Sequence, residues 1–322
     1  MHVLILLALP DAIREQYRAR LQAAFPDVTV TAVEHHTKVG PYIADADALI
    51  TFGAHMSDQV LEDGVKLRWI QALGTGVDGI ADRPALRPGT IVTSLHGLHG
   101  AAVSEAALAS MLALARDLRR SIVNQVAARW ERFPVTLLRG KTVCILGVGI
   151  IAEELAPKCA ALGMTVVGIS SAPRVLPGFT DLRPHQALEE TVSEADYLVV
   201  LAPYTEATRG IVDGRILAAM KPTSFVVNVA RGGVIDEAAL VDALDRKAIA
   251  GAALDVFSEE PLPADHPLWR FDTVLVTPHT AGFHVGYADD ALPIVEENLR
   301  RFIAGDEADL INIVPTPGGE TP

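Results

Sequence analysis

Short apolar runs that alternate with amphipathic segments dominate the first hundred residues. Residues 3–9 form a continuous apolar run, and after Pro10 and Asp11 apolar positions recur at helical spacing. This pattern predicts a strand followed by a helix. Four further runs repeat the theme, at 28–33, 48–52, 67–73 and 91–93. Because apolarity in these runs is mostly continuous rather than alternating, we expect a parallel sheet covered on both faces.

A second series of apolar runs begins after Gly140, at 142–146, 165–169, 197–201, 225–229, 252–256 and 274–277. Helical segments separate most of them, and six such strands with right-handed crossovers make a doubly wound, Rossmann-type parallel sheet. Between the two series, Ala101 to about Arg129 is Ala-rich and Leu-rich without Gly or Pro, which predicts one long connecting helix.

A closing helix is predicted from about Gly286 to Ala304, and residues 315–322 are expected to fray. The fold class is therefore α/β. A doubly wound parallel-sheet Rossmann domain, residues 101–285, is expected to be inserted into a second, flavodoxin-like α/β substrate domain made of 1–100 and 286–322.

Composition and net charge limit the classes of partner that we expect for this protein. The 322 residues, half of them apolar, suffice for two domains with their own cores. A net charge of −13 argues against nucleic acid or an anionic membrane, because the summed field repels polyanions. Neither a signal peptide nor a membrane span is predicted, so we expect a cytoplasmic protein. Cys144 and Cys159 are too few for a disulfide framework or a thiolate metal site.

A glycine fingerprint follows the strand predicted at 142–146. In the run from Gly147 to Ala152, Gly147 permits a tight turn, and Gly149 lets the backbone approach a pyrophosphate. Ile150 and Ile151 open a helix whose N-terminus offers donors and a dipole to phosphates. We therefore predict a dinucleotide site here.

The cofactor is expected to be NADP rather than NAD. Where an acidic residue would bind the ribose 2′-hydroxyl of NAD, the chain has Ser170 and Ser171, while Arg174 can pair with a 2′-phosphate. The alternative is a loop that ignores the 2′ position.

Three ionisable residues follow the last three predicted strands. Taken singly, each has an ordinary explanation: Arg231 as a surface cation, Glu260 as one of an exposed acidic pair, and His279 as a loop histidine whose hydrogen bonds are satisfied. Together they supply what reduction of a 2-oxo acid needs. A guanidinium binds the carboxylate, an imidazole gives the proton, and a carboxylate fixes the imidazole's tautomer and favours its charged form.

The chain resembles, almost end to end, the D-isomer-specific 2-hydroxyacid dehydrogenase family. Besides the fingerprint, the motifs are Gly-Thr-Gly-Val-Asp at 74–78, Asn-Val-Ala-Arg-Gly-Gly at 228–233, Leu-Asp-Val-Phe-Ser-Glu-Glu-Pro at 254–261 and Thr-Pro-His at 277–279. The resemblance implies that Arg231, Glu260 and His279 are the catalytic set, with His279 also at the cofactor. Ser170, where many members carry Asp, and Ala152, in place of a third Gly, depart from the pattern.

The resemblance also implies the remaining contacts. Asp255 would bind the nicotinamide carboxamide, and the backbone N–H groups of Thr75 and Gly76 would hold the substrate carboxylate, since consecutive turn amides make an anion nest. Further cofactor-lining residues would be Ala202, Pro203, Thr205, Val229 and Ala230. The resemblance implies a homodimer too, for which the helix from Ala101 is the expected surface. For a small 2-oxo or 2-hydroxy acid as substrate, we also expect two lobes that close on cofactor binding and bring Thr75 and Gly76 toward Arg231 and His279.

Some questions stay open on the sequence alone. The rival function is a nonenzymatic, corepressor-like sensor of NAD(H). His96 and His99 have a spacing that suggests a metal pair, but no third ligand is evident, and we favour hinge or cleft-wall residues without a metal. Phe283, His284 and Tyr287 either shape the substrate pocket or pack, and the substrate's side chain is not readable.

Overall fold

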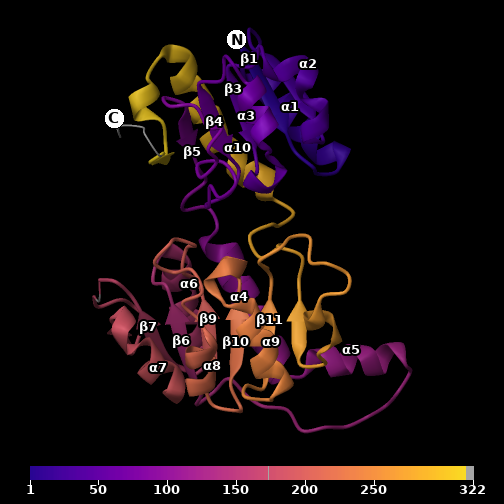
Figure 1. Ribbon diagram of the computed structural model, residues 1–322, viewed down its shortest axis with the longest axis vertical. Coiled ribbons are helices and arrows are strands. Elements are labelled where there is room, and N and C mark those ends of the chain that lie inside the picture. Colours follow the sequence, from indigo (N-terminus) through magenta and orange to yellow (C-terminus); the bar gives the residue numbers. More distant parts are fainter. Residues whose placement is uncertain (173, 317–322) are drawn as a thin grey trace. The chain divides into compact units, whose positions relative to one another are not determined.

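The computed structural model describes residues 1–172 and 174–316 and divides the chain into two compact units (Figure 1). Unit 1 comprises residues 1–99 and 285–322, and unit 2 comprises residues 100–284. The chain therefore leaves unit 1 after His99 and returns to it after His284. Residues 317–322, part of the segment expected to fray, lie outside the described residues.

Unit 1 contains a sheet with the strand order β13-β5-β4-β3-β1-β2, in which only β13 pairs antiparallel within the described ranges. The order 2-1-3-4-5 is that of flavodoxin-like folds. The strands are β1 (His2–Leu6), β2 (Thr29–Val33), β3 (Ala48–Thr51), β4 (Trp69–Ala72), β5 (Ile91–Thr93) and β13 (Ile313–Val314). The helices are α1 (Asp11–Ala24), α2 (Gly40–Ile43), α3 (Asp58–Asp63) and α10 (Tyr287–Ala304).

Alternate residues of β1 enter two different cores. Val3 and Ile5 pack with α1 and α10 on one face, whereas Leu4 and Leu6 pack with α2 and α3 on the other. All four side chains are fully buried. The strand reads as continuously apolar because both of its faces are covered, as expected for a parallel sheet.

Unit 2 contains a parallel sheet with the order β12-β11-β10-β9-β6-β7-β8. The strands are β6 (Thr142–Leu146), β7 (Thr165–Ile169), β8 (Asp181–Arg183), β9 (Tyr197–Val200), β10 (Phe225–Asn228), β11 (Gly251–Leu254) and β12 (Val274–Val276). The helices are α4 (Gly100–Ala115), α5 (Leu118–Val126), α6 (Ile150–Ala161), α7 (Leu188–Glu194), α8 (Gly214–Ala219) and α9 (Glu237–Asp245).

Helices cover both faces of this sheet as well. The helices α7, α8 and α9 pack on one face, and α4 and α6 pack on the other (Figure 1). Cys144 and Cys159 lie in these cores, and burial raises the pKa of each thiol to about 12. Neither is therefore a thiolate at neutral pH.

The predicted fold class is confirmed, but the prediction missed two strands and wrongly joined two helices. The strand β8 was missed because Asp181 and Arg183 leave it a single apolar residue, and it pairs only with β7 at the sheet edge. The two-residue β13 is too short to give any sequence pattern.

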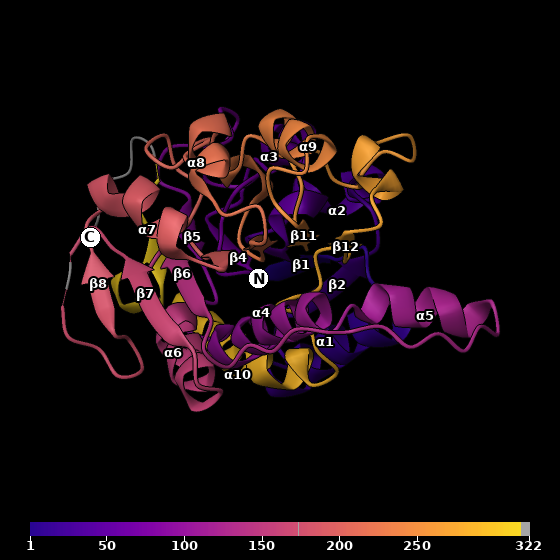
Figure 2. The same ribbon diagram turned by 90° about the horizontal axis from the view of Figure 1, so that it is seen from below.

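The single helix predicted from Ala101 to Arg129 is in fact two helices. Asp117 adopts the left-handed conformation with φ of 47°, and its carboxylate accepts a hydrogen bond from the N–H of Arg120 at 3.4 Å. An Asp side chain that caps a helix in this way begins a new helix without Gly or Pro. As a result α5 leaves the direction of α4, and with the extended segment that follows it projects from the rest of unit 2 (Figure 2).

Candidate active site

Three neighbouring strands of unit 2 end at one edge of the sheet. The strands β10, β11 and β12 are adjacent and parallel. The loops that follow them carry Arg231, Glu260 and His279, respectively. Ligands of doubly wound sheets bind beyond the carboxyl ends of the strands. This edge is therefore where a ligand would meet all three groups.

His279 and Glu260 are joined by a hydrogen bond. His279 Nδ1 lies 2.7 Å from Glu260 Oε2, and Glu260 Oε1 accepts a hydrogen bond from the N–H of Phe257 at 2.9 Å. The side chains keep exposed fractions of 49% and 31%. Because a carboxylate accepts, the imidazole donates through Nδ1, which makes Nε2 the ring nitrogen directed away from Glu260.

The charge of Glu260 depends on this arrangement. Burial acts to raise the pKa of Glu260, but the hydrogen bonds from His279 and Phe257 and the charges of His279 and Arg231 outweigh it. The pKa of Glu260 therefore lies below its ordinary value of 4.5. The structure thus joins His279 and Glu260 directly, and Arg231 lies near enough for its charge to help lower the pKa of Glu260.

A buried carboxylate shapes the turn that carries His279. The backbone of His279 is in the left-handed region, with φ of 53°, which residues other than Gly rarely adopt. Asp255, only 3% exposed, accepts hydrogen bonds from the N–H groups of Thr280 at 2.9 Å and Ala281 at 2.8 Å, and from the hydroxyl of Thr277. Its carbonyl also accepts from the N–H of His279 at 2.8 Å. Asp255 thus fixes the direction of His279, a role that the sequence did not reveal.

The loop that carries Arg231 is held in a similar way by Asn228, the buried last residue of β10. Asn228 Nδ2 donates to the carbonyl of Arg231 at 3.0 Å, and Oδ1 accepts from the N–H of Ala230 at 3.1 Å. A Cβ at Gly232 would lie 2.0 Å from the carbonyl carbon of Phe257, so only Gly lets the two loops approach. Arg231 Nη1 donates to the carbonyl of Ala230 at 2.7 Å, and Val229 is buried.

The glycine fingerprint forms a tight turn from β6 into α6. Gly147 has φ of 98°, and a Cβ on it would lie 2.5 Å from the backbone nitrogen of Ala202. At Gly149 a Cβ would meet nothing within 4 Å, so packing inside the protein does not require glycine there. The open space at the N-terminus of α6, where Ile150 and Ile151 begin the helix, fits a bound pyrophosphate.

Ala202 and Pro203 follow β9 beside this turn. Thr205 donates through its N–H to Thr208 Oγ1 at 2.8 Å, and the Thr208 hydroxyl donates to the carbonyl of Pro203 at 2.6 Å. These contacts shape an exposed turn next to the fingerprint.

The residues expected at the ribose 2′ position lie after β7. Ser170 is buried, and its Oγ accepts from the N–H of Ala172 at 3.3 Å, while Ser171 is exposed. Arg174 Nη2 lies 2.6 Å from an oxygen of Glu153, which stands in the first turn of α6. Arg174 therefore has a carboxylate partner that a 2′-phosphate would have to replace.

In unit 1, the loop from Gly74 to Gly76 follows β4. Across the described ranges, the N–H groups of Thr75 and Gly76 donate to no acceptor of the protein, so both can bind an anion. The Thr75 hydroxyl contacts His99 Nδ1 at 2.7 Å. His96 is exposed, Tyr287 is buried in the core of unit 1, and Phe283 keeps an exposed fraction of 40%.

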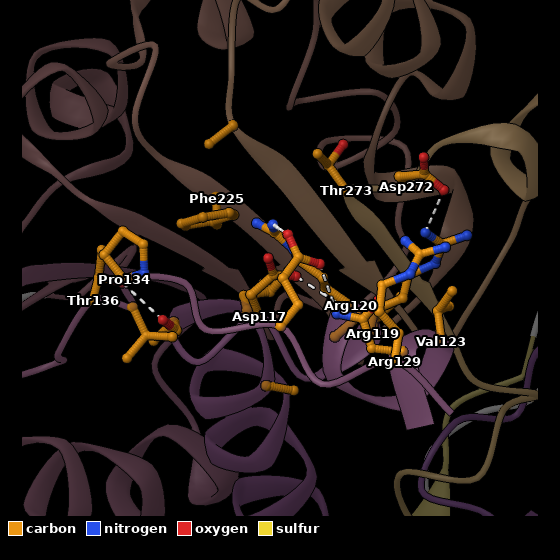
Figure 3. A pocket seen from close by; sticks show the side chains of 18 residues that line it. Asp117, Arg119, Arg120, Val123, Arg129, Pro134, Thr136, Phe225, Asp272 and Thr273 are labelled. Carbon is orange, nitrogen blue, oxygen red and sulfur yellow. Dashed lines mark hydrogen bonds and ion pairs between the residues drawn. The ribbon is translucent and has the colours of Figure 1, made fainter. Parts of the chain in front are cut away.

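A hollow of about 610 Å³ lies elsewhere in unit 2 (Figure 3). It is lined by the end of α4, by α5 and by the residues next to the beginnings of β10 and β12, including Phe225 and Thr273. The beginnings of parallel strands lie at the opposite edge from Arg231, Glu260 and His279. The hollow is therefore not part of the candidate active site.

Two searches over the described residues were negative. No group of three or more His, Cys, Asp or Glu side chains there could hold a metal ion. No helix in the same ranges combines the length and the apolarity that crossing a membrane requires.

Comparison with known proteins gives matches over most of the chain. Residues 108–281 match the family model described as D-isomer specific 2-hydroxyacid dehydrogenase, NAD binding domain. A D-3-phosphoglycerate dehydrogenase of Methanocaldococcus jannaschii is 34% identical over 279 residues, which are 85% of this chain and 53% of that protein. The chain thus spans about half the length of this and other curated relatives.

Solved structures match over nearly the whole chain. A D-isomer specific 2-hydroxyacid dehydrogenase from Xanthobacter autotrophicus, in complex with NADPH and MES, is 31% identical with a TM-score of 0.80, covering 97% of this chain and 98% of that one. An NADPH-dependent glyoxylate/hydroxypyruvate reductase from Sinorhizobium meliloti, in complex with NADP and sulfate, is 26% identical with a TM-score of 0.82 and the same coverage.

The lowered pKa of Glu260 predicts a pH-dependent contribution to stability. A carboxyl whose pKa is lower in the folded state stabilises that state above its unfolded value of 4.5 and loses this effect as the pH falls through the folded value. We expect Glu260→Gln to lower the free energy of unfolding at about pH 7, and the difference from wild type to shrink at about pH 3.5. Urea denaturation at both pH values measures this difference in the free energy of unfolding. Glu259→Gln, at an exposed neighbouring residue, is the control. An equal difference at the two pH values would contradict the prediction.

Proposed function

Because the chain belongs to the D-isomer-specific 2-hydroxyacid dehydrogenase family, we propose that it is an oxidoreductase acting on small 2-oxo and D-2-hydroxy acids with a nicotinamide dinucleotide. The observation that carries the proposal is the 2.7 Å hydrogen bond between His279 and Glu260, formed where Arg231 acts on the same carboxylate. An acid, its orienting carboxylate and a cation are the groups that reduction of a 2-oxo acid requires.

Unit 2 has the residues to hold the cofactor. Gly147, Gly149, Ile150 and Ile151 would bind the pyrophosphate at the N-terminus of α6. The cleft would be lined further by Ala202, Pro203, Thr205, Val229 and Ala230, with Asp255 at the nicotinamide carboxamide. When bound, the reduced cofactor supplies the hydride to carbon 2 of the oxo acid.

Each residue of the catalytic set has a defined task. The Arg231 guanidinium would bind the substrate carboxylate and polarise the carbonyl group. His279 would donate a proton from Nε2 to the carbonyl oxygen during reduction and accept it back during oxidation. Glu260, held as a carboxylate, would stabilise the imidazolium and keep Nδ1 protonated. The N–H groups of Thr75 and Gly76 in unit 1 would contribute further donors for the substrate carboxylate.

Glyoxylate and hydroxypyruvate are the substrates to test first, because the Sinorhizobium meliloti protein is named as a reductase of both. A panel of glyoxylate, hydroxypyruvate, phenylpyruvate and phosphohydroxypyruvate, assayed with NADPH and with NADH, tests the function. Tight binding of the cofactor without turnover of any 2-oxo acid would instead favour a sensor.

Replacing the proton donor should abolish most of the activity. We expect His279→Ala to lower kcat by roughly 100-fold or more, the usual size of general acid catalysis. The Michaelis constant for the reduced cofactor should change little. Steady-state kinetics with the best 2-oxo acid of the panel measures both quantities.

A matched control is His266→Ala, which removes the histidine of another His–Glu pair in unit 2, with Nε2 3.2 Å from Glu237. It should keep kcat within about twofold, because this pair, whose side chains are 20% and 19% exposed, is not part of the proposed catalytic set. Arg231→Ala should raise the Michaelis constant of the oxo acid and lower kcat as well, because it removes contacts from both the ground state and the transition state. Unchanged kcat in His279→Ala would rule out its assignment as the acid.

The ion pair of Arg174 with Glu153 bears on the choice of cofactor. A 2′-phosphate carries more charge than a carboxylate and binds a guanidinium through two hydrogen bonds, so it can displace Glu153. Ser170 and Ser171 offer no carboxylate that would repel the phosphate. We therefore propose NADP as the preferred cofactor.

Arg174→Ala should lower kcat/KM for NADPH by roughly tenfold or more, because it removes the charge-assisted hydrogen bonds to the 2′-phosphate, and leave the value for NADH within about twofold. Glu153→Gln should have the opposite effect on NADPH, because it frees the guanidinium. The ratio of kcat/KM for the two cofactors is the measurement. A wild-type preference for NADH would overturn the proposal.

A second copy of the chain is the proposed partner. The face of α4 that contains Val103, Ala107 and Met111 is buried inside unit 2, which leaves less of this helix for an interface than the sequence suggested. By contrast, α5 and the segment after it expose Ile122 (60%), Val126 (86%) and Trp130 (94%). Contiguous apolar surface of this kind marks a protein interface. Because it projects from unit 2, we place the interface between two copies here rather than on α4 (Figure 2).

Light scattering should therefore give twice the chain mass of 34.3 kDa at micromolar concentration. Replacing the two most exposed of these residues, in Val126→Ser with Trp130→Ser, should yield monomers, because the lost apolar contacts act only in the interface. Val65→Ser, at an exposed apolar residue of unit 1, is the control and should leave the dimer intact. A wild-type mass equal to that of one chain, 34.3 kDa, would refute the dimer.

A further inference from the structure

His99 forms part of a hydrogen-bonded chain that spans the Gly74–Gly76 loop. The Thr75 hydroxyl contacts His99 Nδ1 at 2.7 Å, and His99 Nε2 contacts the Tyr287 hydroxyl at 2.9 Å. The Tyr287 hydroxyl in turn donates to the carbonyl of Leu73. Leu73 and Thr75 flank Gly74, so the chain begins and ends on the two sides of this glycine.

The directions of these hydrogen bonds follow from the number of protons. A carbonyl only accepts, so the single proton of the Tyr287 hydroxyl goes to Leu73. Tyr287 must then accept from His99, which places a proton on Nε2. In the neutral imidazole Nδ1 is consequently an acceptor, and the Thr75 hydroxyl donates to it.

Tyr287 is a rigid support for this chain. It is the first residue of α10 and is 3% exposed, and its ring lies 5.5 Å from that of His99 and 6.2 Å from that of Phe52. Burial raises the pKa of Tyr287 well above its usual range, so the hydroxyl keeps its proton at any working pH.

The rest of the loop is tied to the sheet of unit 1. Leu73 donates through its N–H to the carbonyl of Thr51 at 2.8 Å, and the carbonyl of Gly74 accepts from Leu95 at 2.9 Å. These contacts fix the backbone up to Gly74. The side chain of Thr75 is the next point of attachment, and His99 holds it.

We propose that His99 is a positioning residue, which fixes Thr75 through its Nδ1 so that the N–H groups of Thr75 and Gly76 are preorganised for the carboxylate of the substrate. This inference rests on the proposed function, in which that loop binds the oxo acid. A loop ordered before binding loses less conformational entropy when the anion arrives.

Substrate affinity, and not the chemical step, should therefore depend on His99. We expect His99→Ala to raise the Michaelis constant of the 2-oxo acid by about tenfold, with kcat and the Michaelis constant of the reduced cofactor within about twofold. His99→Asn places an amide oxygen near the position of Nδ1 and should restore most of the affinity. Tyr287→Phe, which removes the hydroxyl that His99 contacts, should have an intermediate effect.

A double-mutant cycle tests the contact itself. Thr75→Val keeps the shape of the side chain and removes its hydroxyl. If His99 acts through Thr75, combining Thr75→Val with His99→Ala should raise the Michaelis constant no further than either change alone. The matched control is His35→Ala, at an exposed histidine of unit 1 that contacts Thr37 Oγ1 at 2.9 Å, and it should leave all constants unchanged.

A measurement without substrate separates this inference from the proposed function. Side-chain ¹⁵N spectra of the wild-type protein should show His99 as the Nε2–H tautomer, with its signal identified by its loss in His99→Asn. In His99→Ala the amide signals of Thr75 and Gly76 should shift, whereas in His35→Ala they should not.

The outcomes are distinct. In one, wild type turns over a 2-oxo acid while His99→Ala and Thr75→Val have additive effects on its Michaelis constant, or while His99→Ala raises the Michaelis constants of the oxo acid and the reduced cofactor equally. Either result would overturn the role of His99 and leave the proposed function standing. If wild type turns over no 2-oxo acid, the proposed function fails. The role in substrate binding then fails with it, and the spectra still decide whether His99 holds Thr75. An Nδ1–H tautomer would overturn the hydrogen-bonded chain in either case.

Discussion

The buried carboxylate of Asp255 determines where His279, the proposed proton donor, is held. Its two oxygens accept hydrogen bonds from the turn after β12, and its own position is fixed because it directly follows β11. An unpaired carboxylate in this place would be costly, so the turn and the carboxylate stabilise each other. His279 can remain in the left-handed conformation because Asp255 accepts hydrogen bonds from the next two residues of the turn, Thr280 and Ala281.

The loops of Arg231 and Thr75 are held in the same way, by hydrogen bonds from polar side chains of the buried Asn228 and Tyr287 and of the partly buried His99. Asn228 holds the loop of Arg231 through both ends of its amide, and the pair of His99 and Tyr287 holds the loop of Thr75. The groups that would contact the oxo acid are thus supported by side chains that would not contact it. Substitution of a supporting residue changes geometry rather than charge at the site.

Much of the fold could be predicted because the sheets are parallel and covered on both faces, which gives short continuous apolar runs. Arg231, Glu260 and His279 could be proposed as a catalytic set because each follows such a run. The supporting contacts could not, since they join residues far apart in the sequence, such as His99 and Tyr287, which are 188 positions apart. The break at Asp117 was missed because helix propensity on both sides of it is high, and one side-chain cap decides the direction of the chain.

The insertion of unit 2 into unit 1 has a consequence for synthesis on the ribosome. The first strands of unit 1 bury Val3, Ile5 and Trp69 against α10, which is encoded after the whole of residues 100–284. At ~5–20 residues per second, that delay is about 10–40 s. During this time one face of the nascent sheet has α1 but lacks α10, the other helix that covers it, while unit 2 has all of its own strands and can fold first. Unit 2 can therefore complete its fold before unit 1, although synthesis of unit 1 begins first.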